Sequence, residues 1–362
     1  MFKFDKYRAN YMGCTKKILF ITGSINQTSQ MHQIAAQLPG FDCWFSQVFT
    51  DAAFAKFLIK NTRLLNGTAL SGQFKENSEK YLHAHGLQID YEAKLNQYDL
   101  VVYCSDLLIP RRMRQYKTIW VQEGMTDKQT LATRIVKALR LPPWLTGNTS
   151  LNGALNVCDI YCAASAGYKS FFAKGGTPAE KIVVTGMPNY DNLQKFLINN
   201  FPYHDYVMVA TTDMRETFRY ENRPAFIREA VKIADGRKLL FKLHPNENAE
   251  RAKKEIQKYA PKGTLIFSDG NTNEMIANCC ELITQYSTVV YTGIALGKKV
   301  HSWFNVDELK KLTPLQNNGS SAKNIAEICR RYALYTGDKK AFSISQPVED
   351  RISVPNVELV VA

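Results

Sequence analysis

Short runs of β-branched and aromatic residues recur along most of this chain, separated by longer stretches of helix-like sequence. This alternation favours parallel sheets with crossover helices over an all-β fold. The runs form two sets of similar size: Lys17–Thr22, Tyr98–Cys104, Lys117–Gln122, Cys158–Ala164 and Glu180–Gly186, then Asp205–Thr212, Lys238–Leu243, Gly263–Ser268, Glu281–Thr284 and Lys298–Trp303. The sequence therefore predicts an α/β protein with two parallel sheets.

The segment Gly186–Asp205 lies between the two sets, is largely polar and has a proline near each end, as linkers often do. A chain of 362 residues is long enough for two domains of about 150 residues each. We predict Rossmann-like domains at residues 1–190, on the acceptor side, and 191–362, on the nucleotide-donor side. Two such domains facing each other place a cleft at the carboxyl ends of their strands, where open α/β sheets bind ligands.

The formal net charge of +13 should attract anions, such as nucleic acid, an anionic membrane or a phosphorylated substrate. Nucleic acid is disfavoured because the sequence has no helix-turn-helix, zinc-finger or aromatic RNP-like pattern. No apolar run approaches the roughly 20 residues of a membrane span, and no secretory signal is visible. We expect a cytoplasmic protein that could also lie on the inner face of the membrane. The eight cysteines lack CxxC pairs, which favours reduced thiols over zinc sites or disulfides.

Two carboxylates follow strands of the first set. Glu123-Gly124 comes after Lys117–Gln122, and Glu123 is a candidate general base because the glycine leaves space for a substrate hydroxyl. The alternative is an ordinary carboxylate at a helix start, favoured by the helix dipole. Asp106 is a second carboxylate at a strand tip. Gly23-Ser24-Ile25-Asn26, after the first strand, has too few glycines for a dinucleotide fingerprint or a P-loop, which disfavours NAD and ATP.

Loops of the second set carry groups suited to phosphate. Ser287 and Thr288 would open a helix whose amides and positive dipole end favour an anion, although Ser287 could simply cap that helix. His244-Pro245 follows another strand, and the alternative for His244 is a surface or packing histidine. Thr212 and Arg215 follow a third strand, where an arginine fork suits phosphate oxygens but a surface salt bridge is the usual role.

No Asp-x-Asp pair follows a strand in a position to hold Mg²⁺ against a diphosphate. Hydroxyl groups, His244 and a helix N-terminus can supply the neutralisation instead. We therefore expect nucleotide binding without a metal ion, and no cofactor other than a nucleotide-activated donor substrate.

The order of Glu123-Gly124, His244-Pro245 and Ser287-Thr288 resembles that of bacterial GT-B sialyltransferases and related transferases that use cytidine-activated donors. The resemblance implies a GT-B-like fold, with two Rossmann-like doubly wound domains facing a central cleft. It also implies that Glu123 deprotonates the acceptor hydroxyl and that His244 contacts the donor phosphate. The negative charge that develops on this phosphate needs further hydrogen-bond donors, which the resemblance assigns to Ser287 and Thr288. The chain departs from the pattern at Gln122, where an acidic residue often precedes the base.

A second resemblance covers EKIVVTGMPNYDNL, which contains Gly186, and ELITQYSTVVYTGIALGKKV. Both read like segments of teichoic-acid glycerophosphotransferases and UDP-N-acetylglucosamine 2-epimerases. The two resemblances together add Gly186 and Pro245 to the residues expected to contact the nucleotide. Thr292 stands where the glycerophosphotransferase pattern has an acidic residue expected to bind ribose. Asp106 and Arg215-Glu216 match epimerase positions, but Asp213 replaces a histidine and the Ser-Gly-Gly run is absent.

These resemblances predict an inverting-type glycosyltransferase that moves a sugar from a nucleotide-activated donor to a glycan or lipid-linked acceptor in surface polysaccharide synthesis. A CMP-linked donor such as CMP-sialic acid is favoured, with CDP- or UDP-linked donors as alternatives. A glycerophosphotransferase using CDP-glycerol, a 2-epimerase-like enzyme and a non-catalytic nucleotide-binding module are the other candidates.

One further stretch, Thr130–Leu145, reads as a basic amphipathic helix followed by more apolar residues. Such a helix could lie on an anionic membrane, where lipid-linked acceptors are found. The four basic residues of Arg111–Lys117 could add to that contact. The alternative is a helix whose apolar face packs on the core.

Overall fold

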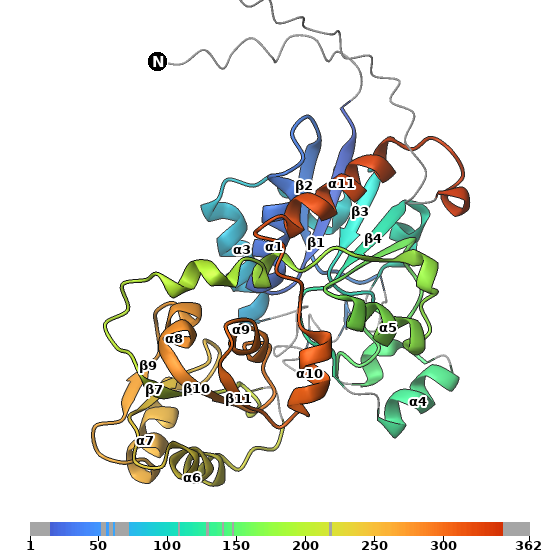
Figure 1. The fold of residues 1–362 in the computed structure, drawn as a ribbon. Helices are drawn as coiled ribbons and strands as arrows, with labels where there is room; N and C mark the ends of the chain where they lie inside the picture. The colour runs from blue at the N-terminus through green and yellow to red at the C-terminus, as the bar shows by residue number, and fades with distance from the viewer. Residues whose placement is uncertain are drawn as a thin grey trace, which may run out of the picture.

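The computed structural model describes residues 15–342 except 52–55, 58–60, 62–71, 108, 128–129, 140, 147 and 217–218. Two parallel sheets, each covered by helices, make up this part of the chain (Figure 1). The strand order is β2-β1-β3-β4-β5-β6 in the first sheet and β11-β10-β7-β8-β9 in the second. The α/β fold with two facing sheets, predicted from the alternating pattern, is confirmed.

The strands of the first sheet are β1 (Lys17–Thr22), β2 (Asp42–Gln47), β3 (Leu100–Tyr103), β4 (Lys117–Val121), β5 (Ile160–Ala163) and β6 (Ile182–Val184). Those of the second are β7 (Tyr206–Ala210), β8 (Leu239–Lys242), β9 (Leu265–Phe267), β10 (Cys279–Thr284) and β11 (Lys299–His301). Every expected strand is present. The strand that the sequence pattern missed, β2, lies at the sheet edge, where it pairs with β1 and its Phe45 forms one further bridge with Ile89.

The α-helices are α1 (Ile25–Ala35), α3 (Gln73–Ala84), α4 (Leu131–Ala138), α5 (Ala166–Gly175), α6 (Arg223–Ala234), α7 (Ala249–Tyr259), α8 (Thr272–Asn278), α9 (Val290–Ala295), α10 (Val306–Leu312) and α11 (Ser321–Leu334). Short 3₁₀ turns occupy Tyr91–Ala93, Arg111–Gln115, Pro143–Thr146, Ala179–Lys181, Pro188–Tyr190, Leu193–Leu197 and Lys339–Ala341. No helix in the described residues is long and apolar enough to cross a membrane. The described cysteines are free thiols.

Each sheet is buried on both faces, as expected for parallel strands. Residues of α1 and α11 form a core with one face of the first sheet, and α5 packs on its other face around Trp120 and Phe172. Helices α6 and α7 cover one face of the second sheet, and α8 covers the other. The sheet change falls between β6 and β7, and the boundary expected near residue 190 lies in this interval.

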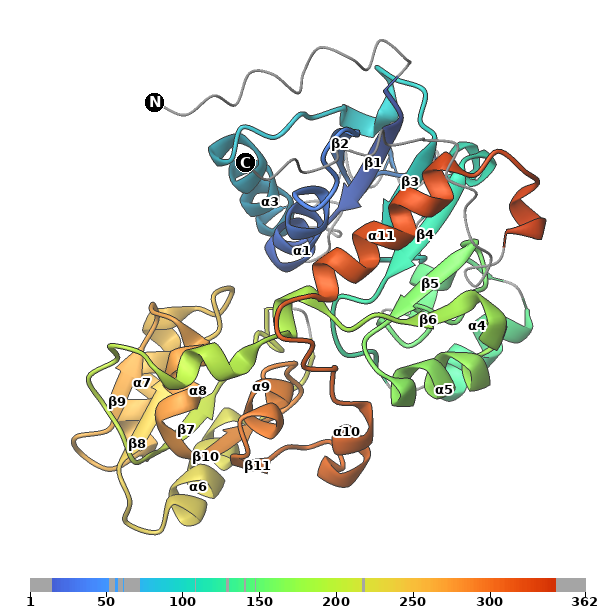
Figure 2. The same ribbon diagram turned by 45° about the horizontal axis from the view of Figure 1, so that its top comes forward.

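Helix α11 departs from the expected division, because it follows the second sheet in the chain but packs on the first (Figure 2). Its Ile325, Cys329 and Tyr332 are fully buried in that core, and Nζ of Lys117 on β4 donates to the carbonyl of Tyr332 at 2.9 Å. An amphipathic pattern shows that a helix buries one face but does not show which sheet receives it. The last helix therefore belongs with residues of the first half.

The two halves also touch directly beside the strand ends. The hydroxyls of Tyr168 on α5 and Tyr291 on α9 lie 2.6 Å apart, and both side chains are buried. A Cβ added at Gly167 would lie 2.0 Å from the carbonyl oxygen of Lys311, so only glycine allows this approach of α5 and α10. These contacts hold the carboxyl ends of the two sheets toward each other.

Candidate active site

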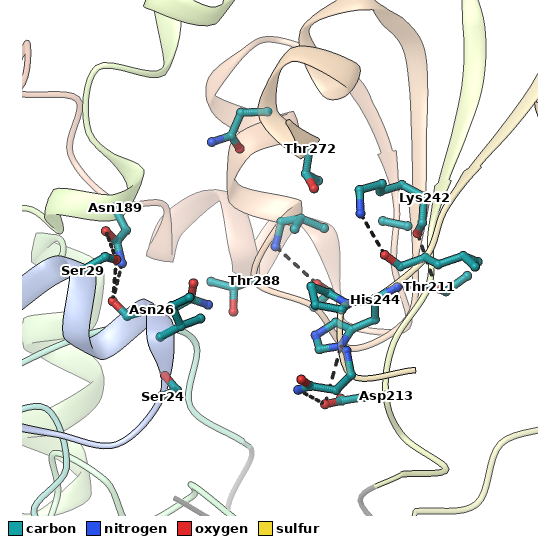
Figure 3. A pocket seen from close by; sticks show the side chains of 18 of the residues that line it. Ser24, Asn26, Ser29, Asn189, Thr211, Asp213, Lys242, His244, Thr272 and Thr288 are labelled. Carbon is teal, nitrogen blue, oxygen red and sulfur yellow. Dashed lines mark hydrogen bonds and ion pairs between the residues drawn. The ribbon is translucent and has the colours of Figure 1, made fainter. Parts of the chain in front are cut away.

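A cavity of about 680 Å³ lies between the carboxyl ends of the two sheets. Figure 3 shows Ser24, Asn26, Ser29 and Asn189 on one side of it, His244, Lys242, Thr211 and Asp213 on the other, and Thr288 between them. The rest of the lining is Ile25, Asn77, Glu123, Tyr190, Ala210, Leu243, Pro245, Asn246, Thr272, Asn273, Ser287 and Val289. Of the residues expected to act in the cleft, Glu123, His244, Pro245, Ser287 and Thr288 are brought together here.

Glu123 follows β4, and its neighbour Gln122 fixes the loop. The Gln122 side chain accepts from the backbone N–H of Ala164 at 2.9 Å and donates to the carbonyl of Gly124 at 3.0 Å. Glu123 Oε2 accepts from Nε2 of Gln27 at 3.4 Å, and burial raises the pKa of the carboxyl above its usual value of 4.5. The residue that replaces the acidic neighbour of the resembled pattern thus has a structural role.

Gly124 brings the Glu123 loop against the second half of the chain. A Cβ added at Gly124 would lie 3.5 Å from Oγ1 of Thr288 and 3.8 Å from its methyl carbon. Tyr190 is the third member of this junction: burial is the main cause that raises its pKa, the charge of Glu123 raises it further, and a hydrogen bond with Thr288 lowers it. The carboxylate and the hydroxyl therefore border the same space.

His244 presents one ring nitrogen as a donor. The backbone N–H of Asn246 donates to Nδ1 at 3.2 Å, so in the neutral ring the proton resides on Nε2. Burial lowers the pKa of His244 below 6.5, against the opposing effect of Asp213, whose Oδ2 lies 3.6 Å from Nδ1. At neutral pH the ring is therefore neutral and can donate from Nε2 to an anion.

Polar groups behind His244 fix the start of its loop. Its backbone N–H donates to Oγ1 of Thr211 at 3.0 Å, and Thr211 donates in turn to Oε2 of Glu247 at 2.5 Å. The carboxylate of Glu247 forms an ion pair with the fully buried Arg223 at 2.5 Å. The histidine loop is thus anchored to a buried network.

Lys242, at the end of β8, is a cation in the cavity wall that the sequence analysis did not identify. Its Nζ donates to the carbonyls of Leu243 at 3.0 Å and Ser268 at 2.8 Å, and burial lowers its pKa. The carbonyls leave the third N–H of the ammonium group for another acceptor. Lys242 could have been identified from the sequence as a cavity residue, because it lies two residues before His244 at the end of the same strand.

The start of α1 forms the opposite wall. Ser24 caps the helix by accepting from the backbone N–H of Gln27, whose side chain bonds back to the Ser24 N–H. Asn189 donates to the carbonyl of Asn26 at 2.8 Å. The sequence analysis rejected this loop as a glycine-rich motif, yet its position after β1 places it in the cavity.

Three residues expected to bind the nucleotide lie elsewhere. Arg215 makes a two-pronged ion pair with Glu255 at 2.8 and 2.9 Å and another with Glu221 at 3.2 Å, so acidic side chains already neutralise its charge. Thr212 is buried and donates to Gln285. At Gly186, where φ is +83°, a Cβ would lie 2.1 Å from Oγ of Ser321, which makes this glycine a packing requirement.

Two further expectations differ from the observed geometry. Asp106 lies buried away from the cavity, where its Oδ1 accepts from the backbone N–H of Gly153 at 3.0 Å, and burial raises its pKa to about 7. Helix α9 begins only at Val290, so Ser287 is not its cap. Among the described residues, no group of three or more His, Cys, Asp or Glu side chains could hold a metal ion.

Solved structures with similar folds share little sequence with this chain. A UDP-GlcNAc 2-epimerase from Methanocaldococcus jannaschii, in complex with UDP-GlcNAc and UDP, has 16% identity and a TM-score of 0.53, covering 87% of this chain and 99% of that one. The S. aureus MnaA–UDP co-structure has 12% identity and a TM-score of 0.52, covering 91% and 100%. The wall teichoic acid polymerase TagF has 14% identity and a TM-score of 0.48, covering 88% of each chain. No protein-family model and no curated protein matches. The two facing sheets and the two structures with TM-scores above 0.5 together show that the chain has the GT-B fold.

Proposed function

We propose that this protein is an inverting glycosyltransferase that moves a sugar from a nucleotide-activated donor to an acceptor hydroxyl. The observation that carries the proposal is the meeting of a half-buried carboxylate, Glu123, with Thr288 and His244 around one cavity between the sheets. A volume of about 680 Å³ is within the range of small-molecule sites. The raised pKa of Glu123 suits a general base.

In the proposed reaction, Glu123 accepts the proton of the acceptor hydroxyl as its oxygen attacks the anomeric carbon. The bond between that carbon and the donor phosphate breaks, and its electron pair stays on the phosphate. Nε2–H of His244, the ammonium group of Lys242 and the hydroxyls of Ser287 and Thr288 stabilise the resulting charge. Attack from the side opposite the leaving phosphate inverts the anomeric configuration.

A cytidine nucleotide is our first choice for the donor, on the strength of the sequence resemblance. Thermal-shift measurements with CMP, CDP, UDP and GDP test this choice, because a ligand of the native state at 100 times its Kd stabilises it by about 2.7 kcal/mol. CMP or CDP should raise the Tm most. The largest shift with UDP would replace the cytidine assignment, and no shift with any of them would remove the nucleotide-dependent function.

An epimerase-like reaction is the second candidate, favoured by a fold that matches almost the entire length of the Methanocaldococcus jannaschii UDP-GlcNAc 2-epimerase. Incubation with UDP-GlcNAc in D₂O separates the two functions, because epimerisation at C2 breaks a C–H bond and introduces deuterium there. Transfer instead releases one molecule of free nucleotide for each acceptor molecule that receives a sugar. CDP-glycerol, with release of CMP, tests the glycerophosphotransferase alternative in the same assay.

Removal of divalent metal should leave nucleotide binding and turnover intact. His244, Lys242 and the hydroxyls of Ser287 and Thr288 can neutralise the phosphate without Mg²⁺. The measurement compares the CMP-induced thermal shift and the turnover rate with and without EDTA. Loss of both with EDTA, followed by recovery with Mg²⁺ or Mn²⁺, would contradict metal-independent binding.

We also propose that the protein, located in the cytoplasm, binds anionic membranes reversibly through α4. Leu131, Ile135 and Leu139 share one side of the helix and are 74%, 48% and 66% exposed, so this side is not the core-facing one. Arg134 is exposed beside them, whereas the ammonium group of Lys137 donates to the backbone carbonyl of Gly175. Arg112 is less suited to this contact than expected, because it pairs with Asp51 and with backbone carbonyls. Arg140 lies outside the described residues.

Flotation with vesicles of phosphatidylcholine and phosphatidylglycerol checks this contact. Each Lys or Arg near such a surface contributes about 1 kcal/mol at low salt, so Arg134→Glu should weaken flotation and 0.5 M salt should nearly abolish it. Leu131→Glu should also weaken flotation at low salt. Ile198→Glu is the matched control, because Ile198 is 94% exposed but lies outside α4. Equal flotation of wild type and both α4 variants would contradict the proposed surface.

A further inference from the structure

A second cavity, of about 640 Å³, lies between α5 and α10, which are side by side in both ribbon views (Figures 1 and 2). We call it the α5–α10 groove. Its apolar wall is formed by Met125, Phe171, Phe304, Leu309 and Leu312. Lys174, Lys311 and Glu308 are also in its lining and are exposed, so the groove is apolar inside and charged at the rim.

A third cavity, of about 180 Å³, shares lining residues with both this groove and the candidate active site. We call it the throat. It shares Ser287 and Thr288 with the active-site cavity, and Met125, Thr126 and Phe304 with the groove. The chain follows the same path: Glu123 lines the active site, Gly124 faces Thr288, Met125 and Thr126 line the throat and the groove. One short segment therefore leads from the proposed base to the apolar wall.

The throat has the chemistry of an anion site. Arg219 lines it, and its pairing with Asp127 is long, at 3.7 Å from Nη1 to Oδ1. Asp127 also accepts from the backbone N–H and the hydroxyl of Thr149, at 2.9 and 2.8 Å, so the carboxylate is shared. Arg219 can therefore direct further N–H donors at an anion.

Thr126 is an independent sign of a missing ligand. The residue is only 8% exposed, and its hydroxyl has no hydrogen-bond partner among the described residues. A buried hydroxyl without a partner is unfavourable, and native structures rarely leave one so. Thr126 lines both the throat and the groove, so the hydroxyl without a partner belongs to a residue at the junction of the two cavities.

We propose that the throat and the α5–α10 groove bind an amphiphile, with its anionic head at Arg219 and Thr126 and its hydrocarbon tail in the groove. This inference rests on the proposed transferase and identifies its acceptor as lipid-linked, because Thr288 of the throat also lines the active-site cavity that contains Glu123. The lysines at the rim suit lipid phosphates. Lys137 of α4 donates to the carbonyl of Gly175, a groove residue, so α4 adjoins the groove.

The test uses butyl, hexyl, octyl and decyl phosphate below their micelle concentrations, with inorganic phosphate as the head alone. Calorimetry measures each Kd on the full chain. Burial of one methylene strengthens binding by at most about fourfold, so we expect the Kd to fall two- to fourfold per methylene until the groove is full. Arg219→Ala should raise every Kd about tenfold, the value of one lost contact to a charged group, and leave the dependence on chain length unchanged.

Ser170→Trp should remove the dependence on chain length, because Ser170 is an exposed residue of the groove and the indole would fill it. Lys169→Trp is the matched control on the same helix, outside the lining. A Kd that is independent of chain length in the wild type, or a dependence that Ser170→Trp leaves unchanged, overturns the proposal. A dimer that Ser170→Trp dissociates also overturns it, because the groove would then be an interface between copies.

The CMP thermal shift, measured on the same proteins, separates this inference from the proposed function. Ser170→Trp should leave the shift unchanged, since the residue is not in the active-site cavity. Normal alkyl phosphate binding without any nucleotide shift would contradict the transferase, and with it the acceptor role of the groove, while the amphiphile site would stand. Nucleotide binding without chain-length dependence would contradict the amphiphile site alone.

Discussion

Replacement of Glu123 by glutamine should lower turnover by about 10²- to 10⁴-fold, the usual effect of losing a general base. The amide has the same shape and can still meet Gln27, but it cannot accept the proton of the acceptor hydroxyl. In the proposed complex the nucleotide contacts groups of the other half of the chain, so its affinity should stay within about twofold of wild type. Turnover at saturating donor and the thermal shift with nucleotide measure the two effects separately.

The pH dependence of the same variant tests the role of the carboxylate. Burial raises the pKa of Glu123 above 4.5, and only the ionised form is a base. In the wild type, kcat/KM should therefore rise with pH through this raised pKa, and Glu123→Gln should lose that acidic limb. A raised folded-state pKa also means that the ionised side chain destabilises the fold at neutral pH, so Glu123→Gln should not lower the Tm.

Glu180→Gln is the matched control, since Glu180 is an exposed glutamate of the same half and does not line the cavity. Asp106, the other carboxylate at a strand tip, cannot replace Glu123, because it is buried against Gly153 away from the cavity. Wild-type turnover in Glu123→Gln would therefore show that the chemistry needs no base from this loop, and would contradict the proposed mechanism.

The central part of the site could be predicted because topology does most of the placing. In a parallel sheet every strand ends at the same edge, so residues just after β4, β8 and β10 must gather on one side of their sheets. Glu123, His244 and Thr288 each come directly after or within a few residues of such a strand. The strand pattern and the expectation that two such domains face each other were enough to bring them together without any knowledge of side-chain packing.

Arg215 shows what the pattern could not supply. It also follows a strand, β7, but its long side chain meets Glu221, Glu247 and Glu255, which come from two later segments. Only the packed structure shows that acidic groups already occupy an arginine. Lys242 is the opposite case: the pattern predicted a core position, because the residue lies inside a buried strand. The structure shows instead that Lys242 lines the cavity, with its ammonium group held by two backbone carbonyls.

The exposed side of α4 and the position of α11 have a common explanation. Both segments are amphipathic, and periodicity alone gives each an apolar side to cover. For α11 the covering surface is the first sheet, which is distant in sequence, whereas the leucines of α4 stay in solvent. Which of these outcomes occurs depends on the area left free by other helices, and this is a property of the whole fold.

Replacement of His244 by alanine should reduce both turnover and nucleotide affinity. Loss of one preorganised donor to a developing negative charge lowers kcat by about 10²- to 10³-fold. In the proposed complex the same N–H contacts the donor phosphate before the reaction. Nucleotide affinity should therefore fall as well, by roughly tenfold, because a bond to a charged group contributes about 1.5 to 3 kcal/mol. Glu123→Gln and His244→Ala should therefore differ in the nucleotide thermal shift, which only the second should reduce.

His244→Gln distinguishes donation from mere shape. The Asn246 N–H holds Nδ1 as an acceptor, so the proton of the neutral ring faces away from it on Nε2. A glutamine amide can place an N–H near that position, so it should recover part of the lost affinity, whereas alanine cannot. His204→Ala, at an exposed histidine of the same half outside the cavity, should behave like wild type. Unchanged nucleotide affinity in His244→Ala, with only kcat reduced, would mean that the imidazole contacts the sugar or the acceptor, because a donor to the phosphate must act in the bound ground state as well.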